Sequence, residues 1–176
     1  MSIILAIPGA SVTARNTTRS ARMRCMHASS LPLTRPASAT PPAFVWPVRV
    51  YYEDTDAAGV VYYANYLRFC ERARTEWLRS LGFEQQRMLE EAHTGFVVSS
   101  VQAHYRRPAR LDDQLQVIST VAEMRGASLL FAQNILRNEE LIFESRICIA
   151  CIDTLRNRPV ALPPALRAQL LTPDPS

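Results

Sequence analysis

Residues 52–82, YEDTDAAGVVYYANYLRFCERARTEWLRSLG, contain the transition that decides the fold of this chain. An acidic segment, residues 54–59, leads into a stretch in which apolar side chains recur every three or four positions. The recurring positions are Tyr62, Tyr66, Phe69, Cys70, Ala73, Trp77 and Leu81. This spacing predicts a helix from Val60 to about Leu81, and Gly82 stands where helices commonly end.

Extended segments flank this helix on both sides. Before it, residues 45–53 (VWPVRVYYE) are rich in β-branched and aromatic residues, which favour a strand. Residues 84–92 are compatible with a short second helix. Four further strands are predicted over residues 95–107, 113–124, 128–138 and 141–153, and a short terminal helix over 163–171. One long helix among five strands predicts an α+β domain in which a five-stranded antiparallel sheet wraps around one central helix.

The predicted helix and sheet both leave surface that a single chain does not cover. The helix is apolar around much of its circumference, so it needs burial on more than one side. The sheet would also end in an unpaired edge strand. Pairing two protomers edge to edge would satisfy both needs, so we expect a homodimer or a homotetramer.

Residues 1–44 differ in composition from the remainder of the chain. They contain five arginines and no acidic residue, whereas the other 132 residues carry 15 basic and 16 acidic groups. The overall net charge of +4 therefore belongs to this segment, which argues against a nucleic-acid-binding face on the domain. Its Ser-, Pro- and Arg-rich sequence predicts a disordered or targeting-like N-terminal extension before a domain at 45–176. No apolar run is long enough to span a membrane, and we expect a cytoplasmic protein.

The acidic loop before the helix carries the residues with the clearest chemical potential. The first amides of a helix lack partners within it and carry a partial positive charge, which can stabilise an oxyanion. Asp56, a few residues upstream, could lie beside them as a nucleophile or general base, and Gly59 permits a tight turn. The same pattern fits a structural helix cap followed by a turn glycine. Asp54 with Asp56 could suggest a metal site, but no third ligand is evident, so we expect neither metal nor cofactor.

Two other features admit more than one interpretation. Glu71 lies within the predicted helix, where it could be a catalytic carboxylate or form an ion pair with Arg68 or Arg74. Cys148 and Cys151 are three residues apart in a predicted strand, so their side chains point to opposite faces and cannot share a metal or a disulfide. We interpret both as buried structural thiols.

Several motifs in this chain together resemble one protein family. The pattern D-T-D-x-x-G-V-V-Y-x-x-x-Y over residues 54–66 is followed by E-R-A-R-T-E on the helix. Further matches lie in Pro108-Ala-Arg-Leu-Asp-Asp113, in Met124-Arg-Gly-Ala-Ser128 and in Ala161-Leu-Pro163. Together they resemble the 4-hydroxybenzoyl-CoA thioesterase branch of hotdog-fold proteins, and are most similar to the Tol-Pal system-associated acyl-CoA thioesterases of Gram-negative bacteria. The resemblance covers about residues 47–170.

The resemblance implies an activity and a set of site residues. The implied reaction hydrolyses an acyl-CoA thioester to a free acid and CoA, and Asp56 is the family's catalytic carboxylate. The backbone donor at the start of the helix falls on Tyr63, where the Tol-Pal-associated members usually have His. Gly59 and Val60 would line the approach of the thioester, and Arg125 would contact the nucleotide of CoA. Acyl carrier protein is an alternative carrier of the acyl group.

Two other functions stay open at this point. A hotdog dehydratase would need a general base, usually His, but no His occurs between residues 28 and 92, which contain the loop and the helix. A non-catalytic adaptor of an acyl-carrier-protein or cell-envelope complex could keep the fold without the reaction, although Asp56 and Gly59 argue against it.

Overall fold

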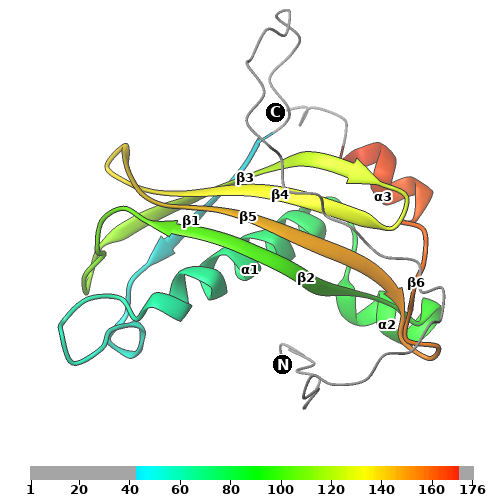
Figure 1. The fold of residues 1–176 in the computed structure, drawn as a ribbon, viewed down its shortest axis with the longest axis horizontal. Helices are drawn as coiled ribbons and strands as arrows, with labels where there is room; N and C mark the ends of the chain where they lie inside the picture. The colour runs from blue at the N-terminus through cyan, green and yellow to red at the C-terminus, as the bar shows by residue number, and fades with distance from the viewer. Residues whose placement is uncertain (1–42, 171–176) are drawn as a thin grey trace, which may run out of the picture. The chain divides into compact units, whose positions relative to one another are not determined.

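The computed structural model describes residues 43–170 of the chain. Residues 1–42, and with them nearly all of the predicted N-terminal extension, lie outside this part, as do residues 171–176. The elements in order are β1 (Ala43–Arg49), a 3-10 turn η1 (Tyr52–Asp54), α1 (Tyr63–Ser80), α2 (Gln85–Ala92), β2 (Thr94–Tyr105), β3 (Gln114–Arg125), β4 (Ser128–Arg137), β5 (Glu140–Asp153), β6 (Arg158–Pro159) and α3 (Pro164–Gln169). The predicted α+β architecture is confirmed, with an antiparallel sheet curled around one long helix (Figure 1).

The sheet has the strand order β1-β3-β4-β5-β2, and every pair in it is antiparallel. The two-residue strand β6, which the sequence pattern did not predict, pairs with the end of β5 at Ile152 and Asp153. β2 pairs with β5 along its whole length, and a bulge interrupts the register between Val98 and Ser100. Within residues 43–170, the other edge of β2 pairs with no strand.

Helix α1 begins three residues later than predicted, at Tyr63. The preceding residues are held in extended backbone, because Asp56 donates its N–H to the carbonyl of Val60 at 2.9 Å and Val61 forms a bridge with Thr55. The helix ends at Ser80, and Gly82 follows with a φ of +81°, a left-handed conformation that favours glycine.

The core lies between α1 and the concave face of the sheet. Phe69 and Ala73 of α1 are fully buried, as are Val117 and Ile135 of β3 and β4. Tyr66, near the start of the helix, stacks on Phe143 of β5 with ring centroids 5.2 Å apart. Burial of each large apolar side chain contributes about 1.5–3 kcal/mol, so this interface supplies much of the stability of the domain.

The two ends of α1 are fixed to different strands. Near its end, the ring of Trp77 stacks on Phe44 of β1 with centroids 5.9 Å apart and planes only 2° apart. At its start, Tyr66 contacts Phe143 of β5 and Tyr105 of β2. Helix α1 therefore crosses the sheet from the β2 edge to the β1 edge (Figure 1).

A buried polar seam joins α1 to the middle of the sheet; it consists of Arg74, Gln133, Ser119 and Cys70. The Arg74 guanidinium donates to Oε1 of Gln133 at 2.6 Å. The Gln133 amide donates in turn to the carbonyl of Cys70 at 3.0 Å and to the hydroxyl of Ser119 at 2.8 Å. Burial lowers the pKa of Arg74, which reflects the cost of placing a guanidinium here.

The predicted ion pair of Glu71 is wrong. Arg74 turns inward to the polar seam, and Arg68 donates to the side-chain oxygen of Asn65 at 3.2 Å. Glu71 itself accepts a hydrogen bond from the hydroxyl of Thr75 at 3.0 Å. Among the described residues, neither arginine forms an ion pair with it.

Cys70 and Cys151 are free, buried thiols. Burial raises the pKa of Cys70 to about 11, so this thiol is not a nucleophile at neutral pH. Within the described part of the chain, no helix is long and apolar enough to cross a membrane.

Candidate active site

Asp54 anchors the loop that connects β1 to α1. Its side chain is buried, and its carboxylate accepts a hydrogen bond from the amide of Tyr51 at 2.9 Å. Its backbone carbonyl accepts two more, from the amide of Tyr62 and from the side-chain amide of Asn65, both at 2.9 Å. One residue therefore ties both ends of the loop together, and a backbone N–H satisfies its buried carboxylate.

Asp56 starts a tight turn at the tip of the same loop. Its carbonyl accepts the N–H of Gly59 at 2.9 Å, and its carboxylate accepts the N–H of Ala58 at 2.8 Å. Gly59 has a φ of +71°, which a residue with a side chain adopts only with strain. The Asp56 side chain is exposed in the protomer. The turn fixes one carboxylate oxygen, and among the described residues the other accepts no hydrogen bond and can meet a ligand.

The start of α1 presents unsatisfied backbone donors. Tyr62 precedes the first helical residue, Tyr63, and among the described residues no side chain caps this end. The amide of Asn65 donates back to the carbonyl of Tyr62, whereas the amides of Tyr63 and Ala64 have no acceptor within residues 43–170. Helix N-termini attract negative charge, so these two amides can bind a carbonyl oxygen on which negative charge develops.

Two adjacent tyrosines, Tyr62 and Tyr63, stand at the start of α1. The rings of Tyr62 and Tyr63 are in contact, with centroids 4.6 Å apart. The pKa of Tyr62 is raised, first by a hydrogen bond with the Tyr63 side chain and further by the nearby charges of Tyr63 and Asp56. Asp56 and the start of α1 are thus close enough for the charge of the one to act on the side chain of the other.

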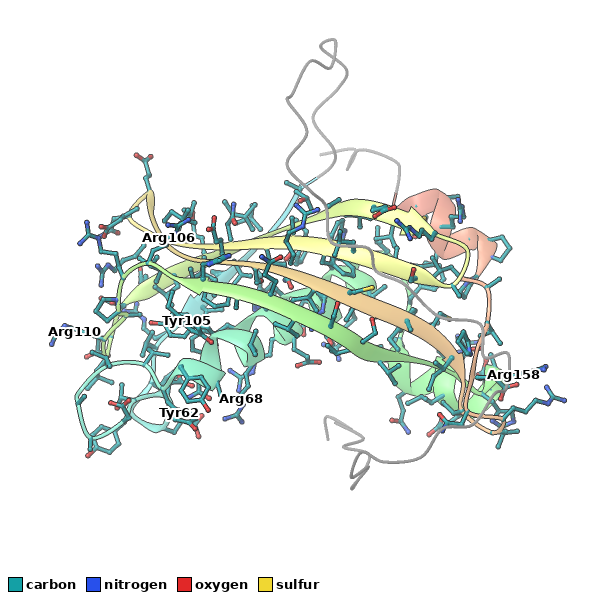
Figure 2. All side chains as sticks on the ribbon, in the orientation of Figure 1. Tyr62, Arg68, Tyr105, Arg106, Arg110 and Arg158 are labelled. Atoms are coloured by element: carbon teal, nitrogen blue, oxygen red, sulfur yellow. The ribbon has the colours of Figure 1, made fainter. Side chains whose placement is uncertain are left out.

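A cavity of about 300 Å³ lies against the first turn of α1. Its lining residues are Val61, Tyr63, Tyr66, Tyr105, Arg106, Arg107 and Pro108. Aromatic rings from α1 and from the end of β2 form most of this wall. Figure 2 shows Tyr62, Tyr105 and Arg106 at the same end of the domain. A ligand whose carbonyl contacts the Tyr63 amide could therefore place an apolar group in this cavity.

The segment after β2 closes the cavity and is fixed from both sides. Ala109 is fully buried; its amide donates to the Tyr66 hydroxyl at 2.9 Å, and its carbonyl accepts the amide of Val61 at 2.8 Å. Arg137 of β4 donates to the carbonyl of Pro108 at 3.1 Å and to the carboxylate of Asp113 at 2.9 Å. The pKa of Arg137 is raised, first by its bond with Asp113, so this clamp is charged at every physiological pH.

The structure brings together four of the five predicted site residues. Asp56, Gly59 and Val60 form the turn, and Tyr63 begins the helix immediately after it. Of these, Tyr63 lines the cavity, whereas the other three lie beside it in the loop. Arg125 is elsewhere: it ends β3, at the opposite end of the strand from Gln114, which pairs with Arg49 shortly before the loop. Its side chain pairs with Glu123 at 2.6 Å.

Sequence reasoning missed the cavity wall formed by Tyr105, Arg106, Arg107 and Pro108. These residues are distant in sequence from the acidic loop, and only the sheet topology brings them to the helix start. The one available signal was the match at residues 108–113, which begins with Pro108. Among the described residues, no three His, Cys, Asp or Glu side chains are grouped as a metal site would require.

Comparison with known proteins identifies the family. Residues 50–170 match the family model of the thioesterase-like superfamily. Over 125 residues the chain is 50% identical to the acyl-CoA thioesterase YbgC of Haemophilus influenzae, and the match covers 71% of this chain and 92% of that protein. The family-model match spans the acidic loop, the central helix and most of the sheet.

Solved structures agree with this assignment. A probable thioesterase from Bartonella henselae is 34% identical with a TM-score of 0.66, over 69% of this chain and 99% of that one. A 4-hydroxybenzoyl-CoA thioesterase, 21% identical with a TM-score of 0.68 over 74% of this chain and 99% of that one, supports the hotdog fold alone. The chain belongs to the thioesterase-like superfamily of hotdog proteins and, within it, to the family of the YbgC acyl-CoA thioesterases.

Proposed function

We propose that this protein hydrolyses acyl-CoA thioesters to a free acid and CoA at the start of α1. One observation carries the proposal. The exposed carboxylate of Asp56 lies in the tight turn that leads directly into α1, where the amides of Tyr63 and Ala64 have no acceptor among the described residues. The 50% identity to an acyl-CoA thioesterase over most of that protein's length supports the same reaction.

In the proposed reaction the thioester carbonyl lies against the first turn of α1. Its oxygen accepts a hydrogen bond from the amide of Tyr63, and the field of the helix stabilises the developing charge. Asp56 then attacks the carbonyl carbon and expels the CoA thiolate, giving a mixed anhydride that water hydrolyses. In the alternative route, Asp56 takes a proton from a water molecule that attacks the same carbon. Either route consumes one water and yields a carboxylate and the thiol of CoA.

An isotope experiment separates the two routes. In a single turnover in ¹⁸O-labelled water, the nucleophilic route can transfer label to the Asp56 carboxylate, which mass spectrometry of the peptide would detect. The general-base route places the label in the product acid and leaves Asp56 unlabelled.

The carboxylate is tested by Asp56→Asn, assayed by thiol release over short, long and aromatic acyl-CoAs. Because general-base contributions alone are about 10²–10⁴-fold, we expect kcat to fall by at least about 10². Asp112→Asn is the matched control, since Asp112 is another exposed loop carboxylate and its φ of +67° suits Asn equally well. Wild-type turnover by Asp56→Asn would contradict the assignment, and no thiol release by the wild type with any substrate would favour the adaptor role.

We also propose that the protein is a homodimer joined through the free edge of β2. This edge is twelve residues long, and Val98 and Val101 on it are exposed. An open edge of this length invites pairing with a second copy. Sedimentation should give a dimer or a tetramer built from two such dimers for the wild type, and Val98→Lys with Val101→Lys should shift it toward monomer. A monomeric wild type would refute this proposal.

Arg125 requires a different placement if it contacts CoA. Because it lies at the far end of β3 from the loop, we propose that it contacts the nucleotide of a CoA bound at a site of another protomer. Arg125→Ala should then raise KM and leave kcat unchanged. An unchanged KM would remove Arg125 from the site.

The carrier and the location follow from the same resemblance. We propose CoA as the carrier, with acyl carrier protein as the alternative, and a cytoplasmic location with a Tol-Pal association. Parallel assays with acyl-CoA and acyl carrier protein carrying the same acyl group would decide the carrier. Cell fractionation followed by co-purification would test location and association.

A further inference from the structure

Tyr105 joins the edge strand of the sheet to the first turn of the central helix. It is the last residue of β2 and is paired with Phe143 of β5. The next two amides, of Arg106 and Arg107, both donate to the carbonyl of Ile142, at 2.8 and 3.1 Å. The end of the strand is therefore fixed, and so is the point from which the Tyr105 side chain leaves it.

Neighbouring rings then fix the direction of this side chain. The ring of Tyr105 meets Tyr63, Tyr66 and Phe143 edge to face, with centroids 6.5, 5.6 and 5.2 Å away. Figure 2 shows it beside the start of α1. Its hydroxyl donates to the carbonyl oxygen of Tyr63 at 3.2 Å. Tyr105 is 49% exposed, so burial alone does not explain why an aromatic phenol stands here.

The carbonyl that accepts this bond belongs to the peptide group that also contains the N–H of Ala64. A hydrogen bond to a peptide oxygen polarises the group and strengthens its N–H as a donor. The same bond holds the first turn in one orientation, which also aims the adjoining amide of Tyr63. The pKa of Tyr105 is raised, chiefly by burial and then by Tyr63, so the hydroxyl stays protonated at neutral pH.

We propose that Tyr105 is a positioning residue for thioester hydrolysis, whose hydroxyl orients and polarises the first turn of α1 so that the amides of Tyr63 and Ala64 stabilise the oxyanion. This inference rests on the proposed function. Because the oxyanion forms only on the way to the transition state, the contribution of Tyr105 falls on kcat and not on substrate binding.

The test is Tyr105→Phe, which keeps the ring and removes only the hydroxyl. The loss of one hydrogen bond of ordinary strength predicts a fall in kcat of about tenfold with KM unchanged. The Kd for an S-alkyl-CoA thioether, which lacks the carbonyl, should equal that of the wild type. Tyr52→Phe is the control, because the Tyr52 residue is 82% exposed; its kcat should not change.

Three outcomes would overturn the inference: a wild-type kcat in Tyr105→Phe, a rise in KM at constant kcat, or a parallel loss of turnover and thioether binding. The last would indicate a merely structural role. Asp56→Asn, assayed in parallel, distinguishes a failure of the Tyr105 inference from a failure of the proposed active site. If Asp56→Asn is inactive and Tyr105→Phe is normal, only this inference fails; if both are normal, the proposed site itself is wrong.

Discussion

Replacing Gln133 by leucine tests the polar seam beneath α1. Gln133 is fully buried in β4 and is the side-chain acceptor for the Arg74 guanidinium, which is itself only 9% exposed. The leucine has nearly the same volume, so the change removes hydrogen bonds without creating a large cavity. The carbonyl of Cys70 and the hydroxyl of Ser119 each lose a donor at the same time.

The charge of Arg74 decides how much stability Gln133→Leu loses. Leaving a buried cation without its partner costs about 3–5 kcal/mol, and the added apolar surface of leucine offsets roughly 1 kcal/mol. We therefore expect Gln133→Leu to lower the free energy of unfolding by about 3 kcal/mol. Arg74→Met leaves only a neutral amide unsatisfied and should cost about 2 kcal/mol. The double variant removes both polar groups and should also cost about 2 kcal/mol, well below the sum of the two single changes.

Urea unfolding of the four proteins at one protein concentration measures these differences, since an oligomer's stability depends on concentration. Gln116→Leu is the matched control, because Gln116 lies on an exposed face of the neighbouring strand β3 and should cost less than about 0.5 kcal/mol. A loss below about 1 kcal/mol for Gln133→Leu, or additive losses in the double variant, would refute the reasoning.

Three further predictions concern the loop, the cavity wall and the core. Gly59→Ala should lower the free energy of unfolding by about 1 kcal/mol because of the φ of +71°, since a Cβ there meets no atom within 4 Å. It should also lower kcat, and an unchanged kcat would show that the turn does not contribute to catalysis. Tyr66→Phe removes the acceptor of the buried Ala109 amide and should lower the free energy of unfolding by about 1–3 kcal/mol, measured by thermal unfolding. A loss near zero would show that this hydrogen bond does not stabilise the segment after β2. Because burial raises the pKa of Cys70 from 9.0 to about 11, the folded state holds this proton more tightly than the unfolded state. Its stabilising effect is present below pH 9 and should be lost between pH 9 and about 11, by up to about 3 kcal/mol. The same decline in Cys70→Ala would assign it to other groups.

The periodic parts of the fold were predictable, and its local exceptions were not. The apolar spacing around Phe69 and Trp77 predicted α1, because a helix packed on a sheet must bury one side every 3.6 residues. Its start was misplaced because Val60 and Val61 continue the apolar pattern, while their backbone is held extended by partners in the loop and at Ala109. The strand β6 was missed because two residues carry no alternation from which a strand can be read.

The candidate site also has a part that was predictable from sequence and a part that was not. Asp56, Gly59 and Tyr63 are close in sequence, so a local motif could place them on one turn. Tyr105 is 42 residues from Tyr63, and its hydrogen bond depends on the order of strands in the sheet, which no local pattern contains. The ion pair expected for Glu71 failed for a related reason, since helical spacing cannot tell that Arg74 finds a buried acceptor on β4.

The diagonal course of α1 links the architecture to the proposed chemistry. Trp77 holds the end of the helix on β1, so the start of the helix falls at the opposite edge, against Tyr105 of β2. There the first amides are open and Asp56 is exposed, which suits the entry of a ligand but leaves the carboxylate and the oxyanion in water. Electrostatic stabilisation is far stronger when water is excluded. The proposed pairing of a second protomer on β2 would cover this same edge, so the surface that completes the sheet would also be the surface that encloses the reaction.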